Sequence, residues 1–490
     1  MSPRATDMTD LFATRRIFVA VLALGLFTMA ARAIADPDIW WHLRSGQLML
    51  QTHSQFHSDP YSFTRFGQPW VNHEWLSQII FFSLYHLGGF GALIVTIAIV
   101  IAATLLLVFA RSPGRPYLAA LMTLWGAAAS APSWGVRPQM FSLLLASIFL
   151  VLLEASVRRP GLLWWTPPLM LLWVNLHAGY PIGLAFIALF LIGEALEAAV
   201  FPDLRSAALP RLKRLSLVLL VCLLAVPLNP NGWRIYPYPF ETLRSVAMHR
   251  FIQEWFSPNF HDPTYLPLLG MLLALLAGLA YSPVRPRLRD VLLLLVTIPA
   301  ALRSIRHIPI LVLVMVPVLS ALAEGWLRQR GSRLLERGSS LPSRRILLLN
   351  ALVLLAFLSF ALGRVGHVIT TQKDTEARQF PQAAVTFLEQ QRPPGPILNH
   401  YNWGGYFIWK LYPQYQVFMD GRADVYGDRL MDQFAATYYL TDDWGMPLQH
   451  WGIRTVILPP DAPLITALKS GNEWKQIYAD PQAVILSRLR

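Results

Sequence analysis

The residues of this sequence that are best placed to do chemistry are two carboxylates, Asp36 and Asp38, which stand two positions apart. They follow the first long apolar run, at the point where a helix would leave a membrane. A carboxylate pair there can take a proton from an acceptor group or hold a divalent cation. The structural alternative is that one aspartate caps the next helix, with Trp40 and Trp41 as interfacial anchors. The spacing alone leaves both explanations open.

A second polar pair, His73 and Glu74, stands at the start of the next apolar run. An imidazole beside a carboxylate can bind a metal ion or orient another ligand, and both residues are also candidate catalytic groups. Asp38 and His73 are the candidate metal ligands, and a divalent metal is the candidate cofactor. Because this spacing does not define a closed set of ligands, the sequence does not decide whether a metal is needed.

Arginines at the ends of apolar runs are candidates for holding a phosphate. Arg303 and Arg306 have the (i, i+3) spacing of one helix face and could grip a lipid-linked phosphate, with Arg137 as a third candidate. Snorkelling to lipid headgroups explains either of the first two arginines alone equally well. Ionisable residues at membrane depth are costly and usually face a cavity, so their gathering at one end of the spans predicts a site.

Two histidines and two aromatic residues are candidate substrate-binding residues. His42 belongs to the same first loop as the acidic pair, whereas His177 is of the kind that more often packs and hydrogen-bonds than binds a ligand. Trp233 and Tyr236 lie in a Trp-, Tyr- and Pro-rich stretch that suits sugar stacking or a lid on the membrane surface. Interfacial aromatic belts have the same composition, which is the structural alternative.

The composition shows what kind of chain positions these residues. Of 490 residues, 54% are hydrophobic and only 14% are charged, and the mean hydropathy is +0.42. Soluble domains carry about 25% charged residues, so this chain is predicted to be a membrane protein. The net charge of +13 is confined to short basic clusters between apolar runs, which argues against a nucleic-acid partner. The single cysteine, Cys222, excludes an intramolecular disulfide.

Eleven apolar runs are candidate transmembrane spans, which predicts an all-α polytopic fold. The second run is too long for one crossing, and we expect it to break at Gly88-Gly89 into an interfacial stretch and a span. The runs cover residues 17–35, 77–110, 117–134, 139–157, 162–177, 181–200, 214–229, 265–281, 290–303, 307–327 and 345–364.

Basic residues orient these spans. With a cytoplasmic N-terminus, arginines and lysines are in clear excess in the predicted cytoplasmic loops, as the positive-inside rule requires. An odd number of spans then places the C-terminal tail on the outer side. We therefore predict a transmembrane domain over residues 1–364, with outer loops at 36–76 and 230–264, and a non-cytoplasmic soluble domain over residues 365–490.

The tail is predicted to be a small α/β domain. A helix is expected near residues 379–391, and the continuous apolar runs at 404–409, 416–420, 455–458 and 483–486 suit buried strands bounded by turns.

The tail also contains an Asp420-Gly-Arg422-Ala-Asp424 segment, which directly follows one of these apolar runs. A turn of this kind can present charges to a ligand, although an Asp–Arg pair that staples a loop is the commoner explanation.

Three motifs resemble those of the GT-C superfamily of membrane glycosyltransferases. They are the Asp-Pro-Asp-x-Trp-Trp-His loop at residues 36–42, the Asn-His-Glu-Trp-Leu element at 72–76 and the Asn-Trp-Gly-Gly-Tyr run at 402–406. The resemblance is to bacterial members that use polyprenyl-phosphate sugars, related to protein mannosyltransferases and aminoarabinose transferases.

The resemblance implies many helices, an outer loop with interfacial helices and a soluble outer domain. It implies that Asp36 or Asp38 is the acceptor-side base or a metal ligand, that His73 and Glu74 lie nearby, and that an arginine holds the donor phosphate. The expected partners are a polyprenyl-phosphate-sugar donor and an envelope glycan, lipid or protein acceptor. The expected location is a bacterial inner membrane, with the C-terminal domain periplasmic or extracellular.

A second reading stays open: a non-catalytic transporter of lipid or polysaccharide, or an envelope-assembly scaffold, with the same fold. Transporters usually contain inverted repeats and polar residues at mid-membrane, whereas mid-span charge is nearly absent here.

Overall fold

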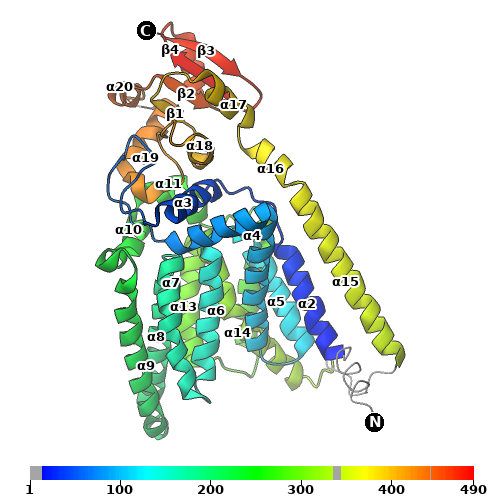
Figure 1. The fold of residues 1–490 in the computed structure, drawn as a ribbon. Helices are drawn as coiled ribbons and strands as arrows, with labels where there is room; N and C mark the ends of the chain where they lie inside the picture. The colour runs from blue at the N-terminus through cyan, green and yellow to red at the C-terminus, as the bar shows by residue number, and fades with distance from the viewer. Residues whose placement is uncertain (1–13, 335–343, 442, 490) are drawn as a thin grey trace.

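The chain folds into a helical bundle with a smaller mixed domain over one end (Figure 1). The computed structural model describes residues 14–334, 344–441 and 443–489. Part of the basic charge used above to orient the chain falls in residues 1–13 and 335–343, which lie outside the described residues.

Each of the eleven predicted spans coincides with a helix. These helices are α2 (Thr14–Ala30), α4 (Trp75–Arg111), α5 (Pro116–Ser130), α6 (Gln139–Ala155), α7 (Thr166–Leu176), α8 (Pro181–Val200), α9 (Arg205–Ala225), α12 (Leu266–Tyr281), α13 (Leu288–Arg303), α14 (Ile308–Gln329) and α15 (Arg344–Thr370).

Fewer than eleven of these helices meet the criteria of length and apolar composition for crossing a membrane. Among the described residues, five helices are long and apolar enough to cross a membrane, and the count rises to six if the bent pair formed by residues 205–228 and 232–244 is one span. The prediction of eleven spans is therefore not confirmed. The helix α7, for example, has 11 residues, and at 1.5 Å per residue it is shorter than a hydrocarbon core of about 30 Å.

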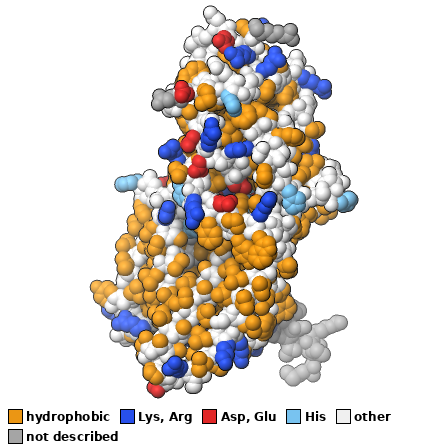
Figure 2. All heavy atoms as spheres, turned by 90° about the vertical axis from the view of Figure 1, so that its left-hand side faces the viewer, with side chains coloured by type: hydrophobic (Ala, Val, Ile, Leu, Met, Phe, Trp, Pro, Cys, Tyr) orange, Lys and Arg blue, Asp and Glu red, His pale blue; other side chains and the backbone are white. Residues whose placement is uncertain are grey.

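The surface agrees with a multi-pass membrane protein. In the space-filling view, hydrophobic side chains cover the helical part of the molecule, and charged side chains gather above this region and at its lower end (Figure 2). Of the candidate spans, α14 is the most buried within the bundle and α15 is the least buried. Since lipid tails solvate apolar side chains, an exposed apolar helix such as α15 is stable at the edge of a membrane domain.

The first outer loop forms the layer between the bundle and the smaller domain. It contains the amphipathic helix α3 (Ile39–Thr52), which buries Trp40, Trp41 and Leu43. The next helix, α4, leaves helical geometry at Gly88 and at Gly89, whose φ is +58°. The predicted break is therefore confirmed, and its first part lies across the end of the bundle beside α3 (Figure 1).

The predicted aromatic loop at 230–264 is a chain of short helices, because its prolines repeatedly interrupt longer ones. They are η5 (Gly232–Ile235), α10 (Tyr238–Arg244), α11 (Val246–Phe251), η6 (Gln253–Trp255) and η7 (Pro263–Tyr265). The short helix η4 (Val226–Leu228) precedes the loop, and η8 (Ile305–His307) links α13 to α14.

The C-terminal domain is a four-stranded sheet with helices. Its strand order is β1-β2-β4-β3, with β1 and β2 parallel and the other neighbours antiparallel. Its elements are α16 (Gln372–Gln379), α17 (Gln382–Gln391), β1 (Ile397–Asn399), η9 (Tyr401–Trp403), α18 (Gly404–Leu411), α19 (Ala423–Tyr439), α20 (Met446–His450), β2 (Thr455–Leu458), α21 (Pro463–Ser470), β3 (Trp474–Ala479) and β4 (Val484–Arg488).

Two of the four predicted strands of this domain are wrong. The run at 404–409 is the helix α18, and the run at 416–420 is an irregular segment with one isolated bridge, between Val417 and Ser62 of the first loop. A short continuous apolar run fits a buried helix as well as a buried strand, which is why the pattern misleads. The runs at 455–458 and 483–486 do form strands β2 and β4, and the predicted helix near 379–391 is α17.

Backbone contacts join the C-terminal domain to the first outer loop and to Ile34, just before the loop. Gln372 hydrogen-bonds both the N–H and the carbonyl of Ile34, at 2.8 and 2.9 Å. Val417 pairs with the loop backbone at Tyr61 and Phe63, at 3.1 and 3.2 Å. The domain is therefore hydrogen-bonded directly to the loop that carries the acidic pair.

Candidate active site

A cavity of about 360 Å³ lies where the helical bundle, the first outer loop and the C-terminal domain meet. It gathers residues from at least five separate stretches of the chain. Of the residues predicted from the sequence, those that line the cavity are Asp38, His42, His73, Glu74, Arg137, His177 and Arg306.

Asp38 is the N-cap residue of α3, but its carboxylate makes no capping hydrogen bond. It accepts instead from the indole N–H of Trp41, at 3.1 Å. Within the described part of the chain, no basic side chain forms an ion pair with Asp38. Burial raises the pKa of Asp38 to about 7, even though the Trp41 hydrogen bond acts to lower it. This carboxylate therefore has the proton affinity of a general base near neutral pH.

Asp36 has a different role, because it is already paired. Its Oδ1 accepts the backbone N–H of Asp38 at 2.9 Å, which is the turn-stabilising role considered for this pair. Its Oδ2 forms an ion pair with Arg137, which also pairs with Glu254. The acidic pair is therefore divided between a structural carboxylate and an available one.

Glu74 is surrounded by three imidazoles. The Nε2 atoms of His73 and His177 both lie 3.5 Å from its Oε1, and the Nε2 of His42 lies 3.8 Å from its Oε2. Burial alone would raise the pKa of Glu74, but the three histidines, His73 first, hold it below the usual range of a glutamate. Glu74 is thus an ionised side chain that orients the histidines around it.

The hydrogen bonds of His177 define its tautomer. The indole N–H of Trp173 donates to the Ser142 hydroxyl at 2.7 Å, so Ser142 donates its own hydrogen to Nδ1 of His177, at 2.8 Å. The same Nδ1 accepts the N–H of Gly179 at 2.9 Å. Nδ1 therefore has no hydrogen, and the N–H of His177 is on Nε2, facing Glu74. Burial lowers the pKa of His177 to about 3, which keeps the ring neutral.

His73 is the member of the group whose pKa is raised. Its Nδ1 lies 3.3 Å from the carbonyl of Val71, which can only accept a hydrogen bond. Burial alone would lower the pKa of His73, but the Glu74 carboxylate reverses this and raises it. His42, by contrast, is kept neutral, because burial lowers its pKa to about 4. The Nε2 of His73 also lies 3.5 Å from the hydroxyl of Tyr238.

The cationic part of the cavity is formed by Arg137 and Arg306. The guanidinium of Arg306 lies over the Trp255 ring at 5.1 Å, and it acts electrostatically on both Asp38 and Glu74. A second cavity, of about 230 Å³, shares both arginines with the first. Arginines against an aromatic wall suit a phosphate, because the ring keeps the guanidinium plane in place.

Four predicted residues lie elsewhere. Asp36 lines the second cavity and not the first. Arg303 is exposed at the end of α13 and does not share a helix face with Arg306, because Ser304 between them is extended. Trp233 and Tyr236 lie outside both cavities, where their rings stack on each other at 5.8 Å.

Asp38 and His73 are the metal ligands considered from the sequence. Among the described residues, no group of three or more His, Cys, Asp or Glu side chains is arranged to hold a metal ion. The cluster around Glu74 is instead occupied by hydrogen bonds and ion pairs among its own members.

Several residues that line the cavity were not among the predicted site residues: Tyr238, Glu254, Trp255, Tyr401 and Asp424. The first three lie in the Trp- and Pro-rich stretch, of which only Trp233 and Tyr236 were predicted to bind substrate. Tyr401 directly precedes the Asn-Trp-Gly-Gly-Tyr motif, and Asp424 ends the Asp-Gly-Arg segment, so both were near a recognised signal.

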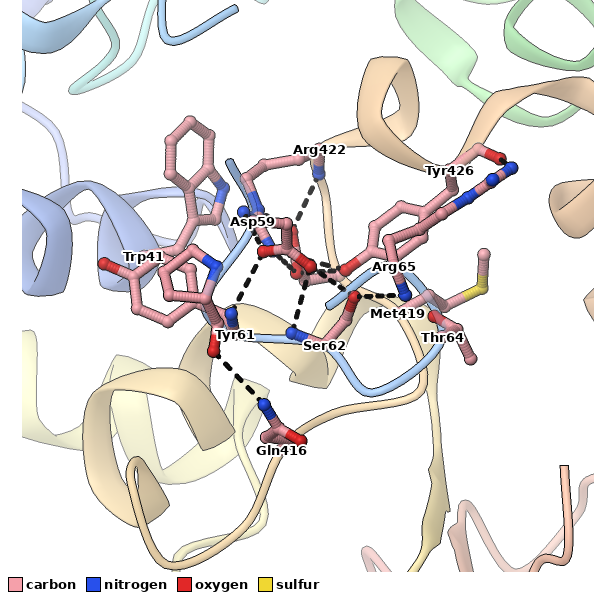
Figure 3. A network of polar contacts seen from close by, with 12 residues as sticks. Trp41, Asp59, Tyr61, Ser62, Thr64, Arg65, Gln416, Met419, Arg422 and Tyr426 are labelled. Atoms are coloured by element: carbon pink, nitrogen blue, oxygen red, sulfur yellow. Dashed lines mark hydrogen bonds and ion pairs between the residues drawn. The ribbon is translucent and has the colours of Figure 1, made fainter. Parts of the chain in front are cut away.

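The Asp-Gly-Arg segment is a buried ion-pair network (Figure 3). Arg422 donates to Asp420 at 2.6 Å and to Asp59 of the first loop at 2.8 Å, and its side chain is 1% exposed. Its guanidinium lies 5.0 Å from the Tyr61 ring and 4.7 Å from the Trp70 ring. The explanation of an Asp–Arg pair that staples a loop is confirmed, and the staple joins two domains.

The bundle of apolar helices, the interfacial helix behind an acidic pair and the mixed domain over the site form a fold that is similar to that of a solved archaeal oligosaccharyltransferase. Archaeal oligosaccharyltransferase AglB from Archaeoglobus fulgidus, in complex with an inhibitory peptide and a dolichol-phosphate, matches with a TM-score of 0.56 and 11% identity, over 90% of this chain and 68% of that chain. The apo form of the oligosaccharyltransferase from that organism matches with a TM-score of 0.53 and 11% identity, over 90% and 69%.

ArnT from Cupriavidus metallidurans, bound to undecaprenyl phosphate, matches over 96% of this chain and 98% of that chain, with 14% identity and a TM-score of 0.49. No protein-family model matches the sequence, and no curated protein matches it. At 11% identity, the two oligosaccharyltransferase matches show a shared fold, which agrees with the fold expected from the three motifs.

Proposed function

We propose that this protein is a glycosyltransferase that moves a sugar from a polyprenyl-phosphate-linked donor to an acceptor of the cell envelope. The observation that carries the proposal is that Asp38, a carboxylate with no capping hydrogen bond and no ion pair among the described residues, shares a cavity with Arg306. A base for the acceptor and a cation for the leaving phosphate are the two groups that this transfer needs.

The reaction is a single displacement. The acceptor oxygen attacks the anomeric carbon, the bond from that carbon to the phosphate oxygen breaks, and the acceptor proton passes to Asp38. The phosphate leaves with the electron pair of the broken bond, and Arg306, with Arg137 beside it, stabilises its charge. Glu74 does not act as the base in this scheme, because His42, His73 and His177 surround its oxygens.

The fold supports a lipid-phosphate donor. The oligosaccharyltransferase AglB, which shares the fold, was solved with a dolichol-phosphate bound. The cavity here lies at the end of the apolar bundle, where a polyprenyl tail could remain in the membrane while its phosphate reaches the arginines. The proposed setting is a bacterial inner membrane, with a cytoplasmic N-terminus and the C-terminal domain on the outer side.

The scheme routes no step through a metal ion, and the divalent metal considered for Asp38 and His73 stays a prediction. Turnover in the presence of EDTA tests it.

The test of the function is a mass-spectrometric assay for free polyprenyl phosphate. Purified protein in detergent is incubated with a panel of polyprenyl-phosphate sugars and a cell-envelope extract. We expect protein-dependent release of the carrier lipid, and loss of that release in Asp38→Asn. Asp432→Asn is the matched control, because Asp432 forms an exposed ion pair with Arg250. No release by folded wild-type protein with any donor would favour the transporter or scaffold reading.

A further inference from the structure

The C-terminal domain forms one wall of the reaction cavity. Two of its segments reach the cavity: Tyr401 and Asn402 from η9, and residues 421–424 from the Asp-Gly-Arg turn. The turn lies directly against the base, because a Cβ added at Gly421 would approach Oδ1 of Asp38 to 1.7 Å.

This wall is held in place by buried charge. Arg422, Asp420 and Asp59 are each no more than 1% exposed, and Arg422 bridges the two carboxylates. Further bonds cross the same junction, from Thr64 to the carbonyl of Phe418 at 2.6 Å and from Arg44 to that of Tyr412 at 2.7 Å. An interface with this many buried polar bonds positions the two segments as part of the site.

The wall is acidic. Asp424 lines the cavity beside Glu74 and Asp38, and it interacts with His73 and with the phenol of Tyr238. The nearby charge of Arg422 is not available to a ligand, because its N–H groups are used by Asp420 and Asp59. Arg137 is likewise paired, with Asp36 and Glu254, so among the described residues Arg306 is the cavity arginine without a carboxylate ion pair.

Tyr401 interacts with both the acidic and the cationic side chains of the cavity. Its phenol is close enough to act electrostatically with Asp38, Asp424 and Arg137. Trp41 and Trp70 add aromatic faces to the same wall. Carboxylates and a phenol beside aromatic rings are the groups that bind hydroxyl-rich molecules, by hydrogen bonds to the hydroxyls and packing on the ring faces.

We propose that Asp424 and Tyr401 are acceptor-binding residues, and that the acceptor is an uncharged, hydroxyl-rich glycan. An anionic acceptor is disfavoured, because its charge would lie near the carboxylates of Asp38 and Asp424. The inference rests on the function proposed above and assigns the acceptor side of the same cavity to the C-terminal domain.

The test separates acceptor binding from donor binding. A delipidated cell-envelope extract is divided by anion exchange into neutral and anionic fractions, and release of polyprenyl phosphate is measured against the concentration of each fraction. The neutral fraction should be the better acceptor for wild-type protein. Asp424→Asn and Tyr401→Phe should each raise its half-saturating concentration by about 10- to 100-fold, the loss expected for a charge-assisted hydrogen bond. The half-saturating donor concentration should stay unchanged.

The control is Asp432→Asn, which makes the same change on an exposed part of α19. Equal losses for donor and acceptor would show a structural role and overturn the proposal. So would normal acceptor use by both variants, or a wild-type preference for the anionic fraction. Wild-type protein without any release overturns the proposed function itself, and that result is distinguishable because it is seen before any substitution is made.

Discussion

Gly421 of the C-terminal domain lies in direct contact with Asp38 of the first outer loop, although the two residues are far apart in the sequence. An added Cβ at Gly421 would come within 1.7 Å of Oδ1 and 2.8 Å of Cγ of Asp38. A glycine at this position is therefore needed for a close approach of the turn to the base.

Replacing Gly421 by alanine should displace the Asp38 carboxylate while the protein stays folded. We expect turnover to fall by about 100-fold, since a misplacement of about 1 Å at a reacting group has an effect of that size. The control is Gly445→Ala in the same domain, because an added Cβ at Gly445 meets nothing within 4 Å. Turnover is measured as release of polyprenyl phosphate, and equal activity of the two variants would contradict the assigned contact.

The pKa of Asp38, about 7, gives a prediction for the pH dependence of the reaction. A general base must be ionised, so kcat/KM should rise as the pH increases towards 7 and level off above it. At pH 5 it should be about 100-fold below the plateau. The indole N–H of Trp41 acts to lower this pKa, so Trp41→Phe should move the rise by about one unit to higher pH. A rate that is flat from pH 5 to 8 would exclude Asp38 as the base.

Glu74 raises the pKa of His73, and this can be measured directly. In Glu74→Gln the largest contribution that opposes burial is removed, and only Asp424 and the carbonyl of Val71 still oppose it, so the pKa of His73 should fall. Nitrogen-15 NMR of labelled histidines at several pH values follows this change. Glu473→Gln, which removes an exposed pair with Arg488, is the control and should leave the His73 signal unchanged. An unaltered His73 titration in Glu74→Gln would show that another group raises this pKa.

The buried network of Arg422 predicts a large loss of stability. Arg422→Gln leaves Asp59 and Asp420 buried without their cation, which costs about 3–5 kcal/mol of unfolding free energy. Arg250→Gln breaks an exposed pair with Asp432 and should cost no more than about 1 kcal/mol. Thermal unfolding in detergent compares the two variants, and similar midpoints would mean that the network does not hold the domain in place.

The helices of the bundle could be predicted because each apolar run is too long for a strand and long enough for a helix. Gly88-Gly89, for example, broke the long second run as expected, because a glycine with a φ of +58° ends regular helix. The run at 404–409 was misread as a strand, since six apolar residues carry no period that separates helix from strand.

The site was predicted only in part, because local sequence patterns do not show which distant segments meet in the fold. Residues of the first loop were found because they are next to each other in the sequence, as Asp36 and Asp38 are. The division of roles between them depends on Arg137, which is about 100 residues away along the chain and, of the two aspartates, pairs with Asp36. The contribution of Asp424 depends on the folding of a second domain against the first loop, which local spacing cannot show.

The two arginines that the sequence treated as equivalent, Arg303 and Arg306, give a test of the donor site. Arg306 faces the cavity over Trp255, whereas Arg303 is exposed at the end of α13. Binding of a polyprenyl phosphate in mixed micelles should therefore weaken by about tenfold or more in Arg306→Gln, the loss of a charge-assisted bond. Arg303→Gln should bind within about twofold of wild type, since an exposed charge near the membrane contributes little to a buried contact. If both variants lost affinity equally, the two arginines would act through the general charge of the membrane surface, and the phosphate would have to be placed elsewhere in the cavity.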